Sequence, residues 1–378
     1  GALMIRADFD AARCVVVKAG SSLLQAGDAV IAAIVADIMT LRARAARVII
    51  VSSGAVALGR DRLGLPVGGL SLEQKQAAAA AGQPRLLQLW ERAFAVHGVI
   101  TAQALLTLDV TESRRSWLNA RATLSTLLDL GAVPIVNEND TIATDEIRYG
   151  DNDRLAARVA QLAGADLLVL LSDIEALHDA DPRRSADARR IHDIPAITAQ
   201  IHAMAGEANS GAGVGTGGMR TKILAAELAG ASGCATAIAL GTAANPLLSL
   251  ARPDHGTWFQ PSGTPASARE RWISGVVSRH GAVRIDAGAA QALKAGKSLL
   301  PVGVTQIEGQ FERGETIRIL GPDGHVIARG VTAYNAADAR RVAGCRSDEA
   351  ETRLGYRRAA ALIHTDDIVR VGQMERDS

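Results

Sequence analysis

The sequence predicts an α/β fold: a mostly parallel central sheet covered by helices on both faces, followed by a small, mostly-β domain. Short runs of β-branched residues alternate with longer helical patterns along the first part of the chain, which is typical of a parallel sheet. These strand-like runs are apolar throughout, as expected for strands buried on both faces. At 378 residues the chain is also long enough for two domains.

The predicted elements of the first domain follow one another in regular alternation. The expected strands are Cys14–Lys18, Val48–Ser52, Val99–Leu106, Val133–Val136, Asp166–Leu171 and Thr236–Leu240. The expected helices are Asp28–Ala46, Ser71–Ala81, Gln83–Val96, Trp117–Leu130, Asp151–Leu162 and Met219–Ala231, with Gly82 and Pro84 separating the second from the third. Because ligands of such sheets bind beyond the carboxyl ends of the strands, each strand–loop junction is a candidate site.

The pattern changes near Gly256, where helical periodicity gives way to short β-like segments. We predict a first domain over residues 4–258, a linker over 259–272 and a second domain over 273–378. The Asp323-Gly324 pair predicts a hairpin turn. The expected strands of the second domain are Trp272–Ser278, Val302–Glu308, Glu315–Leu320, Val326–Val331 and Asp367–Val371.

Composition excludes several classes of protein. Hydrophobic residues make up 48% and charged residues 21%, which argues against disorder, and no apolar run approaches the roughly 18 residues of a membrane span. The net charge of +1 gives no overall attraction to nucleic acid. Three widely spaced cysteines predict neither disulfides nor a zinc site, so we expect a reducing cytoplasm. We interpret Gly1-Ala2-Leu3 as a cloning scar before Met4, with no secretory signal after it.

Lysine is used sparingly. Only five of the 41 basic residues are Lys, and two of them, Lys18 and Lys222, lie in glycine-rich segments. A retained Lys indicates a position that needs a compact, mobile ammonium group instead of the planar fork of Arg. Codon bias is the alternative explanation.

Two strands of the predicted sheet end in small polar residues. Lys18-Ala19-Gly20-Ser21-Ser22 places free backbone N–H groups and an ammonium group where an anion could bind, although it is not a Walker A loop and a plain turn is the alternative. Ser52-Ser53-Gly54-Ala55 could present helix N-terminal N–H groups to a carboxylate, or serve only as a helix cap.

A concentrated polar segment follows the strand Val133–Val136. Asn137-Glu138-Asn139-Asp140 comes directly after it, and Asp151-Asn152-Asp153 opens the next helix. Carboxylates and amides together could bind a zwitterionic amino acid. The EF-hand pattern fails here, because the second group has consecutive acidic and amide residues and no loop glycine after them. A solvated turn stays open as the alternative.

A glycine-rich loop, residues 211–218, leads into a helix whose first turn carries Lys222. This composition is typical of a loop that lies on nucleotide phosphates at a helix N-terminus. Residues 213–218 match GxGxxG, but no strand precedes them, so the dinucleotide interpretation fails. A flexible linker is the other alternative. Ser172-Asp173, after another strand, could complete a nucleotide site or cap a helix.

Taken together, these segments suit phosphoryl transfer. Two Lys-bearing glycine segments and an Asn/Asp cluster would meet at the strand ends, and that reaction needs positioning and charge neutralisation more than covalent chemistry. A carboxylate acceptor is already ionised at neutral pH and needs no general base. We therefore assign none of the eight His residues a role.

The segments also resemble a known family. VVVKAGSSLL (15–24), VSSGAVALGR (51–60), VPIVNENDTIA (133–143), YGDNDRLAA (149–157) and GVGTGGMRTK (213–222) are similar to motifs of the amino-acid kinase family, and the C-terminal part resembles a PUA domain. The resemblance implies an amino-acid-kinase-like sandwich. It further implies ATP-dependent, Mg²⁺-requiring phosphorylation of the side-chain carboxylate of L-glutamate to γ-glutamyl phosphate, the first step of proline biosynthesis. Mg²⁺ is expected through the ATP phosphates, with no protein metal ligands.

The resemblance also implies roles for individual residues. Lys18 and Lys222 would flank the transferred phosphoryl group, and Asp153 would hold their ammonium groups in place. The residues expected to bind glutamate, directly or in support, are Ser53, Asn137, Asp140, Asp151 and Asn152. Those expected to bind the nucleotide are Lys18, Gly20, Ser172, Asp173, Thr216, Gly217, Gly218, Met219, Arg220, Thr221 and Lys222.

Two other functions compete with this one. Another amino-acid kinase could act on N-acetylglutamate, aspartate or a nucleoside monophosphate. An RNA-binding role of the PUA-like domain is not expected, because residues 271–378 carry 16 Lys and Arg against 13 Asp and Glu, with only four aromatic residues. We expect a homo-oligomer, no membrane partner, and a γ-glutamyl phosphate reductase that consumes the unstable product.

Overall fold

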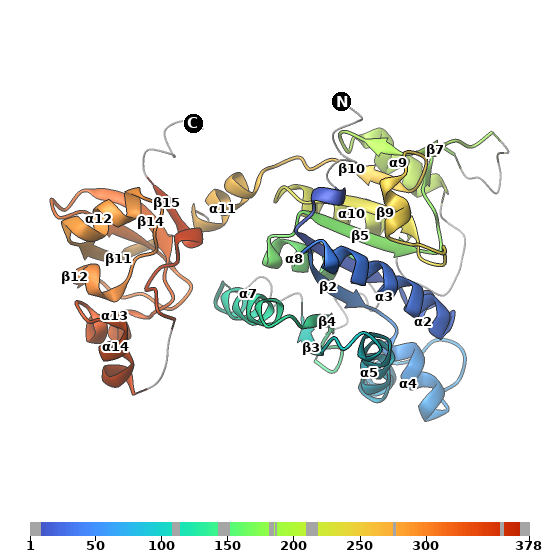
Figure 1. Cartoon of the computed structure of the whole chain (residues 1–378), viewed down its shortest axis with the longest axis horizontal. Coiled ribbons are helices and arrows are strands. Elements are labelled where there is room, and N and C mark those ends of the chain that lie inside the picture. The colour runs from blue at the N-terminus through green and yellow to red at the C-terminus, as the bar shows by residue number, and fades with distance from the viewer. Residues whose placement is uncertain are drawn as a thin grey trace. The chain divides into compact units, whose positions relative to one another are not determined.

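The computed structural model describes residues 9–107, 114–142, 152–180, 185, 187–208, 218–274, 277–355 and 359–370. Two compact units divide the chain, Gly1–Pro265 and Ala266–Ser378 (Figure 1). The predicted linker, residues 259–272, includes the last residue of one strand and most of a helix, α11 (Pro265–Ser274). The exact domain boundaries stay a prediction.

The larger unit is built on an eight-stranded sheet with the order β3-β4-β2-β1-β5-β9-β10-β8. Neighbouring strands are parallel except β9 and β10, which are antiparallel. The strands are β1 (Cys14–Ala19), β2 (Arg47–Ser52), β3 (Thr101–Leu106), β4 (Val133–Glu138), β5 (Leu167–Ser172), β8 (Asp193–Ile194), β9 (Ala235–Leu240) and β10 (Thr257–Phe259). A separate small hairpin joins β6 (Leu177–His178) to β7 (Arg190–Ile191).

The strands are apolar throughout because each of their faces packs into a different core. Val15 and Val17 of β1 belong to one hydrophobic cluster, whereas Val16 between them belongs to another. The first cluster includes residues of α2 (Ser21–Gln25), α3 (Asp28–Ala43), α4 (Ala55–Leu63) and α5 (Leu72–Ala95). The second includes residues of α7 (Arg114–Asp129), α8 (Asn152–Ala163), α9 (Ala199–Ala208) and α10 (Met219–Gly230). The predicted α/β sandwich with a mostly parallel sheet is confirmed.

The helix α5 differs from its prediction. The sequence predicts two helices separated at Gly82 and Pro84, but α5 runs without a break from Leu72 to Ala95. Tertiary packing overrides the local signal: Leu86, Trp90 and Phe94 are all fully buried against the sheet, so the face they share holds the helix together. Pro84 is accommodated inside the helix.

Glycine at position 82 has a packing role instead. A Cβ atom at Gly82 would lie 1.7 Å from the carbonyl oxygen of Ala55, and one at Gly59 would lie 1.6 Å from that of Ala78. The backbones of α4 and α5 therefore approach each other directly at these two glycines (Figure 1). This contact fixes α5 against the start of α4, which immediately follows β2.

The smaller unit contains a five-stranded sheet with the order β12-β11-β13-β14-β15. Its strands are β11 (Val277–Ile285), β12 (Val304–Glu308), β13 (Thr316–Leu320), β14 (Val326–Val331) and β15 (Ile368–Arg370). One core forms against α12 (Ala287–Lys294), α13 (Ala336–Val342) and α14 (Ser347–Leu354), which the sequence analysis did not predict. The predicted strand Trp272–Ser278 is wrong in its first part, since Trp272 lies in α11. The predicted hairpin is confirmed, with Gly324 at φ +82° between β13 and β14.

Replacing Gly82 with Ala should separate packing from helix propensity. Propensity alone predicts a gain of about 1 kcal/mol, because Gly is a poor residue inside a helix. The contact with Ala55 predicts a loss of about 3 kcal/mol, because backbone cannot move aside as a side chain can. Chemical denaturation measures the sign.

Gly69→Ala is the matched control. A Cβ at Gly69 would meet nothing within 4 Å, so the unfolding free energy should change by less than about 0.5 kcal/mol. A Gly82→Ala protein as stable as this control would contradict the close helix contact.

Candidate functional site

Polar side chains gather at one edge of the larger sheet because β1, β2, β4 and β5 are mutually parallel neighbours. Their carboxyl ends carry Lys18, Ser52, Asn137 and Ser172 respectively. Two helices, α8 and α10, begin at the same edge with Asn152 and Met219. The topology alone therefore brings together segments that lie more than 200 residues apart in the sequence.

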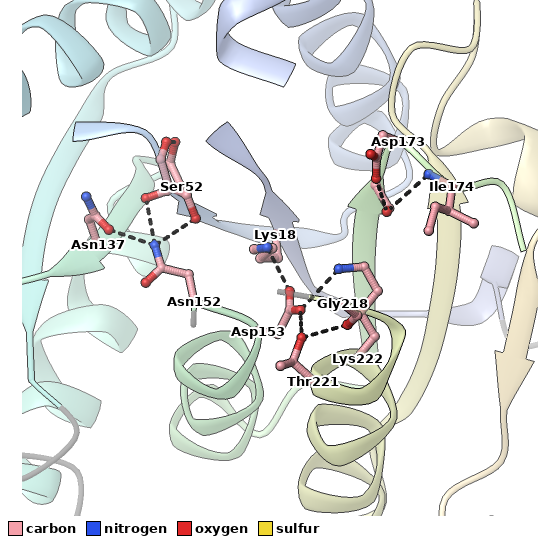
Figure 2. A network of polar contacts seen from close by, with 12 residues as sticks. Lys18, Ser52, Asn137, Asn152, Asp153, Asp173, Ile174, Gly218, Thr221 and Lys222 are labelled. Atoms are coloured by element: carbon pink, nitrogen blue, oxygen red, sulfur yellow. Dashed lines mark hydrogen bonds and ion pairs between the residues drawn. The ribbon is translucent and has the colours of Figure 1, made fainter. Parts of the chain in front are cut away.

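Two ammonium groups share a single carboxylate at this edge. Lys18 Nζ lies 2.7 Å from Asp153 Oδ1, and Lys222 Nζ lies 3.1 Å from Asp153 Oδ2. Thr221 Oγ1 lies 2.8 Å from the same Oδ2 and 2.8 Å from the carbonyl oxygen of Gly218 (Figure 2). The three charged side chains are at most 7% exposed. Two cations held by one anion leave this buried cluster with one positive charge in excess.

The pKa of Asp153 follows from these contacts. Burial alone would raise it, but the charges of Lys18 and Lys222 and the hydrogen bonds from Lys18 and Thr221 outweigh burial, so the pKa lies well below the usual Asp value. The pKa of Lys222 is lowered, chiefly by burial and against the attraction of Asp153. Asp153 is therefore ionised throughout the physiological range.

A second cluster surrounds Asn152, the residue before Asp153. Asn152 Nδ2 lies 2.9 Å from Ser53 Oγ, 2.9 Å from Asn137 Oδ1 and 3.3 Å from the carbonyl oxygen of Ser52. Figure 2 shows this amide cluster beside the lysine cluster, joined through the first turn of α8. Consecutive residues of one helix thus serve two adjacent polar clusters.

Glycines begin three helices at this edge. Gly20, Gly54 and Gly218 are the N-cap residues of α2, α4 and α10, and none of these helices has a side-chain cap. Gly54 has φ +112°, a conformation that side chains other than that of Gly rarely adopt. Helix N-termini with small caps favour anions, because their first N–H groups and their dipole face the ligand.

Asp140 lies in the turn after β4, where it is partly buried. Burial raises its pKa to about 6. Since burial of this carboxylate destabilises its charged form, its presence here indicates a functional role, such as ligand binding.

The remaining predicted site residues lie in different surroundings. Ser172 and Asp173 follow β5, with Ser172 Oγ 3.1 Å from Asp173 Oδ1, and the charge of Asp173 acts on Lys222. Met219 is buried in the second hydrophobic cluster, so only its backbone could meet a nucleotide, and Arg220 is exposed. Asp151, Thr216 and Gly217 lie outside the described residues.

Sequence reasoning missed three residues of the amide cluster. Gln83 Oε1 accepts a hydrogen bond from Asn137 Nδ2 at 2.8 Å, and Trp90 Nε1 donates to Ser52 Oγ at 2.9 Å. Ser52 was named only within the segment Ser52–Ala55, as part of a helix start that could receive a carboxylate or serve as a cap, and its side chain was given no role. The interpretation of Gly82 and Pro84 as a helix break hid the fact that Gln83 and Trp90, seven residues apart, lie on one face of one helix.

The described residues contain neither a membrane span nor a metal-binding cluster. No helix in the part of the chain that the structure describes is long and apolar enough to cross a bilayer. The same residues contain no group of three or more His, Cys, Asp and Glu that could hold a metal ion. Cys14, Cys234 and Cys345 are free thiols, as predicted.

Comparison with known proteins decides the family. The model of the amino acid kinase family matches residues 13–239, and that of the PUA domain matches residues 281–354. A glutamate 5-kinase of Caulobacter vibrioides is 54% identical over 366 residues, which cover 95% of this chain and 97% of that protein. Glutamate 5-kinases of Cereibacter sphaeroides and Rhizobium etli are each 52% identical, over 96% and 97% of this chain and 98% and 95% of their own.

This chain belongs to the amino acid kinase family. The resemblance noted in its motifs is therefore confirmed along with the C-terminal PUA domain. Membership also gives the two clusters a common context, since a kinase must place a phosphoryl donor beside its acceptor.

Asp140 should make stability depend on pH in a specific direction. Because its pKa of about 6 lies above the ordinary Asp value of 3.8, the charged form disfavours folding, and Asp140 destabilises the folded state increasingly as the pH rises from about 4 to 6. Asp140→Asn should therefore raise the unfolding free energy above pH 6, with an advantage that disappears below pH 4. Urea titrations across this pH range measure it. An Asn variant that is equally or less stable at pH 8 would contradict the raised pKa.

Proposed function

We propose that this protein transfers the γ-phosphoryl group of ATP to the side-chain carboxylate of L-glutamate, giving γ-glutamyl phosphate and ADP. The glutamate 5-kinase names of its relatives support the substrate pair. Within the structure, the single observation that carries the proposal is the pair of ammonium groups on Asp153.

The lysine cluster suits the charge that moves during phosphoryl transfer. Its excess positive charge, buried and therefore weakly screened, would stabilise negative charge on the phosphoryl oxygens between donor and acceptor. Lys18 on β1 and Lys222 on α10 contact different oxygens of Asp153, so they can also contact different oxygens of one phosphoryl group. Asp153 would keep both lysine side chains in place without becoming protonated.

The amide cluster suits an amino-acid acceptor. Asp140 could pair with the ammonium group of glutamate, and the N-terminus of α4 after Ser53 and Gly54 could receive a carboxylate. The acceptor carboxylate is ionised already, so no general base is required. Asn152 and Asp153, being adjacent, would place this acceptor beside the lysines.

The nucleotide would lie against the start of α10 and the end of β5. Gly218 and Thr221 begin α10, and Ser172 and Asp173 follow β5. Mg²⁺ would enter with the ATP phosphates as part of the substrate. When bound, the ion neutralises phosphate charge.

The cellular context follows from the proposed product. An acyl phosphate hydrolyses readily, so a γ-glutamyl phosphate reductase should consume it, completing the early steps of proline biosynthesis. Homo-oligomerisation, a physical association with that reductase and a cytoplasmic location stay predictions.

A hydroxylamine trap tests the proposal. Hydroxylamine converts an acyl phosphate to a hydroxamate, so ATP, Mg²⁺ and L-glutamate should give hydroxamate in step with ADP. Lys222→Ala should reduce the rate about 10²- to 10³-fold, the range seen when one charge-stabilising donor is lost. The exposed Lys294→Ala in the smaller unit is the control and should match wild type.

Other acceptors provide the contrary outcome. N-acetylglutamate, aspartate and UMP should each release little ADP. Turnover of one of these with none of glutamate would refute the proposed substrate, and full activity of Lys222→Ala would refute the role of the lysine cluster.

A further inference from the structure

Gln83 belongs to the amide cluster, although it lies in a helix and not at the end of a strand. It lies on α5 between Gly82, where α5 contacts α4, and Pro84. Its Oε1 is 2.8 Å from Asn137 Nδ2, and it is half-buried. The local sequence is poorly suited to a helix, so a polar side chain held here by tertiary packing invites a functional explanation.

One backbone group identifies which end of the Asn137 amide is the oxygen. The N–H of Glu138 donates to Asn137 Oδ1 at 2.8 Å, and a backbone N–H can only donate. Asn137 must therefore point its Oδ1 toward Glu138 and its Nδ2 toward Gln83. Asn152 in turn must direct its Nδ2 toward Asn137 Oδ1, 2.9 Å away.

This order determines what Asn152 offers to a ligand. Its Nδ2 is occupied by Asn137 and Ser53, so the remaining polar atom is the carbonyl oxygen, Oδ1. Among the described residues Oδ1 has no hydrogen-bond partner, and it is not a sealed, buried atom. An acceptor with this orientation suits the ammonium group of an amino acid.

Gln83 supports this order at a cost to itself. Its Nε2 is buried and has no hydrogen-bond partner among the residues that the structure describes, a situation that costs about 1–3 kcal/mol. An apolar side chain of similar size, such as Met, would avoid that cost. The gain that offsets it is the single bond from Asn137 to Gln83 Oε1.

The helix α5 holds the other side of the cluster as well. Two turns after Gln83, Trp90 Nε1 donates to Ser52 Oγ at 2.9 Å, and the Ser52 carbonyl oxygen lies 3.3 Å from Asn152 Nδ2. Both side chains leave the same face of α5. The helix thus contacts two residues that accept from Asn152 Nδ2, Asn137 and Ser52, in each case through another atom of that residue.

We propose that Gln83 is a positioning residue of the amide cluster: together with the backbone N–H of Glu138, it holds Asn137 in the orientation that turns Asn152 Oδ1 toward the ammonium group of the acceptor. This role rests on the proposed function for the identity of the acceptor, but the hydrogen-bond order itself does not depend on it. Gln83 acts through Asn137.

Gln83→Met tests the proposal by separating the two substrates. Loss of one neutral hydrogen bond should raise KM for glutamate about five- to tenfold, while KM for ATP and kcat stay within twofold. The thermal midpoint should change little, because the variant removes the buried unpaired N–H of Gln83 but leaves Asn137 Nδ2 without its acceptor. Gln88→Met is the matched control: Gln88 is equally half-buried on the same helix, where it accepts from Arg85, and neither KM should change.

An Asn137→Ala background identifies the route. If Gln83 acts through Asn137, the double variant should have the same KM for glutamate as Asn137→Ala alone. The proposal is overturned by an unchanged glutamate KM in the single variant, by equal effects on both substrates, or by a full effect that persists in the Asn137→Ala background. If the wild-type protein proves inactive on glutamate, the proposed function fails, and the same KM comparison with the acceptor it does use then decides the role of Gln83.

Discussion

The site depends on one interaction: two buried ammonium groups, from Lys18 and Lys222, contact the two oxygens of Asp153. One carboxylate cannot neutralise two cations, and burial prevents water from doing so efficiently. The cluster is therefore electrostatically incomplete, and an anion is the partner that would complete it. Its low-pKa carboxylate acts as a fixed anchor, since protonating it would release both lysines.

The fold serves this interaction through parallel strands. The end of β1 provides Lys18, while β2 beside it and β4 on the far side of β2 provide acceptors around Asn152. Helix α8 then links the two clusters, because Asn152 and Asp153 are consecutive and their side chains leave the helix in different directions. The separation of the two clusters is set by the first turn of a helix and not by a flexible loop. Such a rigid arrangement suits a reaction that depends on positioning.

Much of this arrangement could be predicted from sequence because its signals are local. Strands such as Cys14–Ala19 are continuous apolar runs, and the polar residues after them mark the ligand-binding edge. The pairing of Lys18 with Lys222 follows once the sheet is known to be parallel. What could not be predicted arises from contacts between distant elements. The continuity of α5 depends on packing of Leu86, Trp90 and Phe94, and on the approach of Gly82 to Ala55. Gln83 was hidden for the same reason, and Trp272 was assigned to a strand because a short apolar segment carries no clear period.

The central claim is that Lys18 and Lys222 together hold the group in transfer. A crystal structure with ADP, Mg²⁺, glutamate and aluminium fluoride, which imitates the phosphoryl group between donor and acceptor, tests it most directly. We predict that the fluorine atoms, which stand in for the phosphoryl oxygens, lie within hydrogen-bond distance of both Nζ atoms, and that Asp153 still contacts both lysines. A fluoride group bound away from either lysine, or a Lys222 side chain turned out of the site, would contradict it.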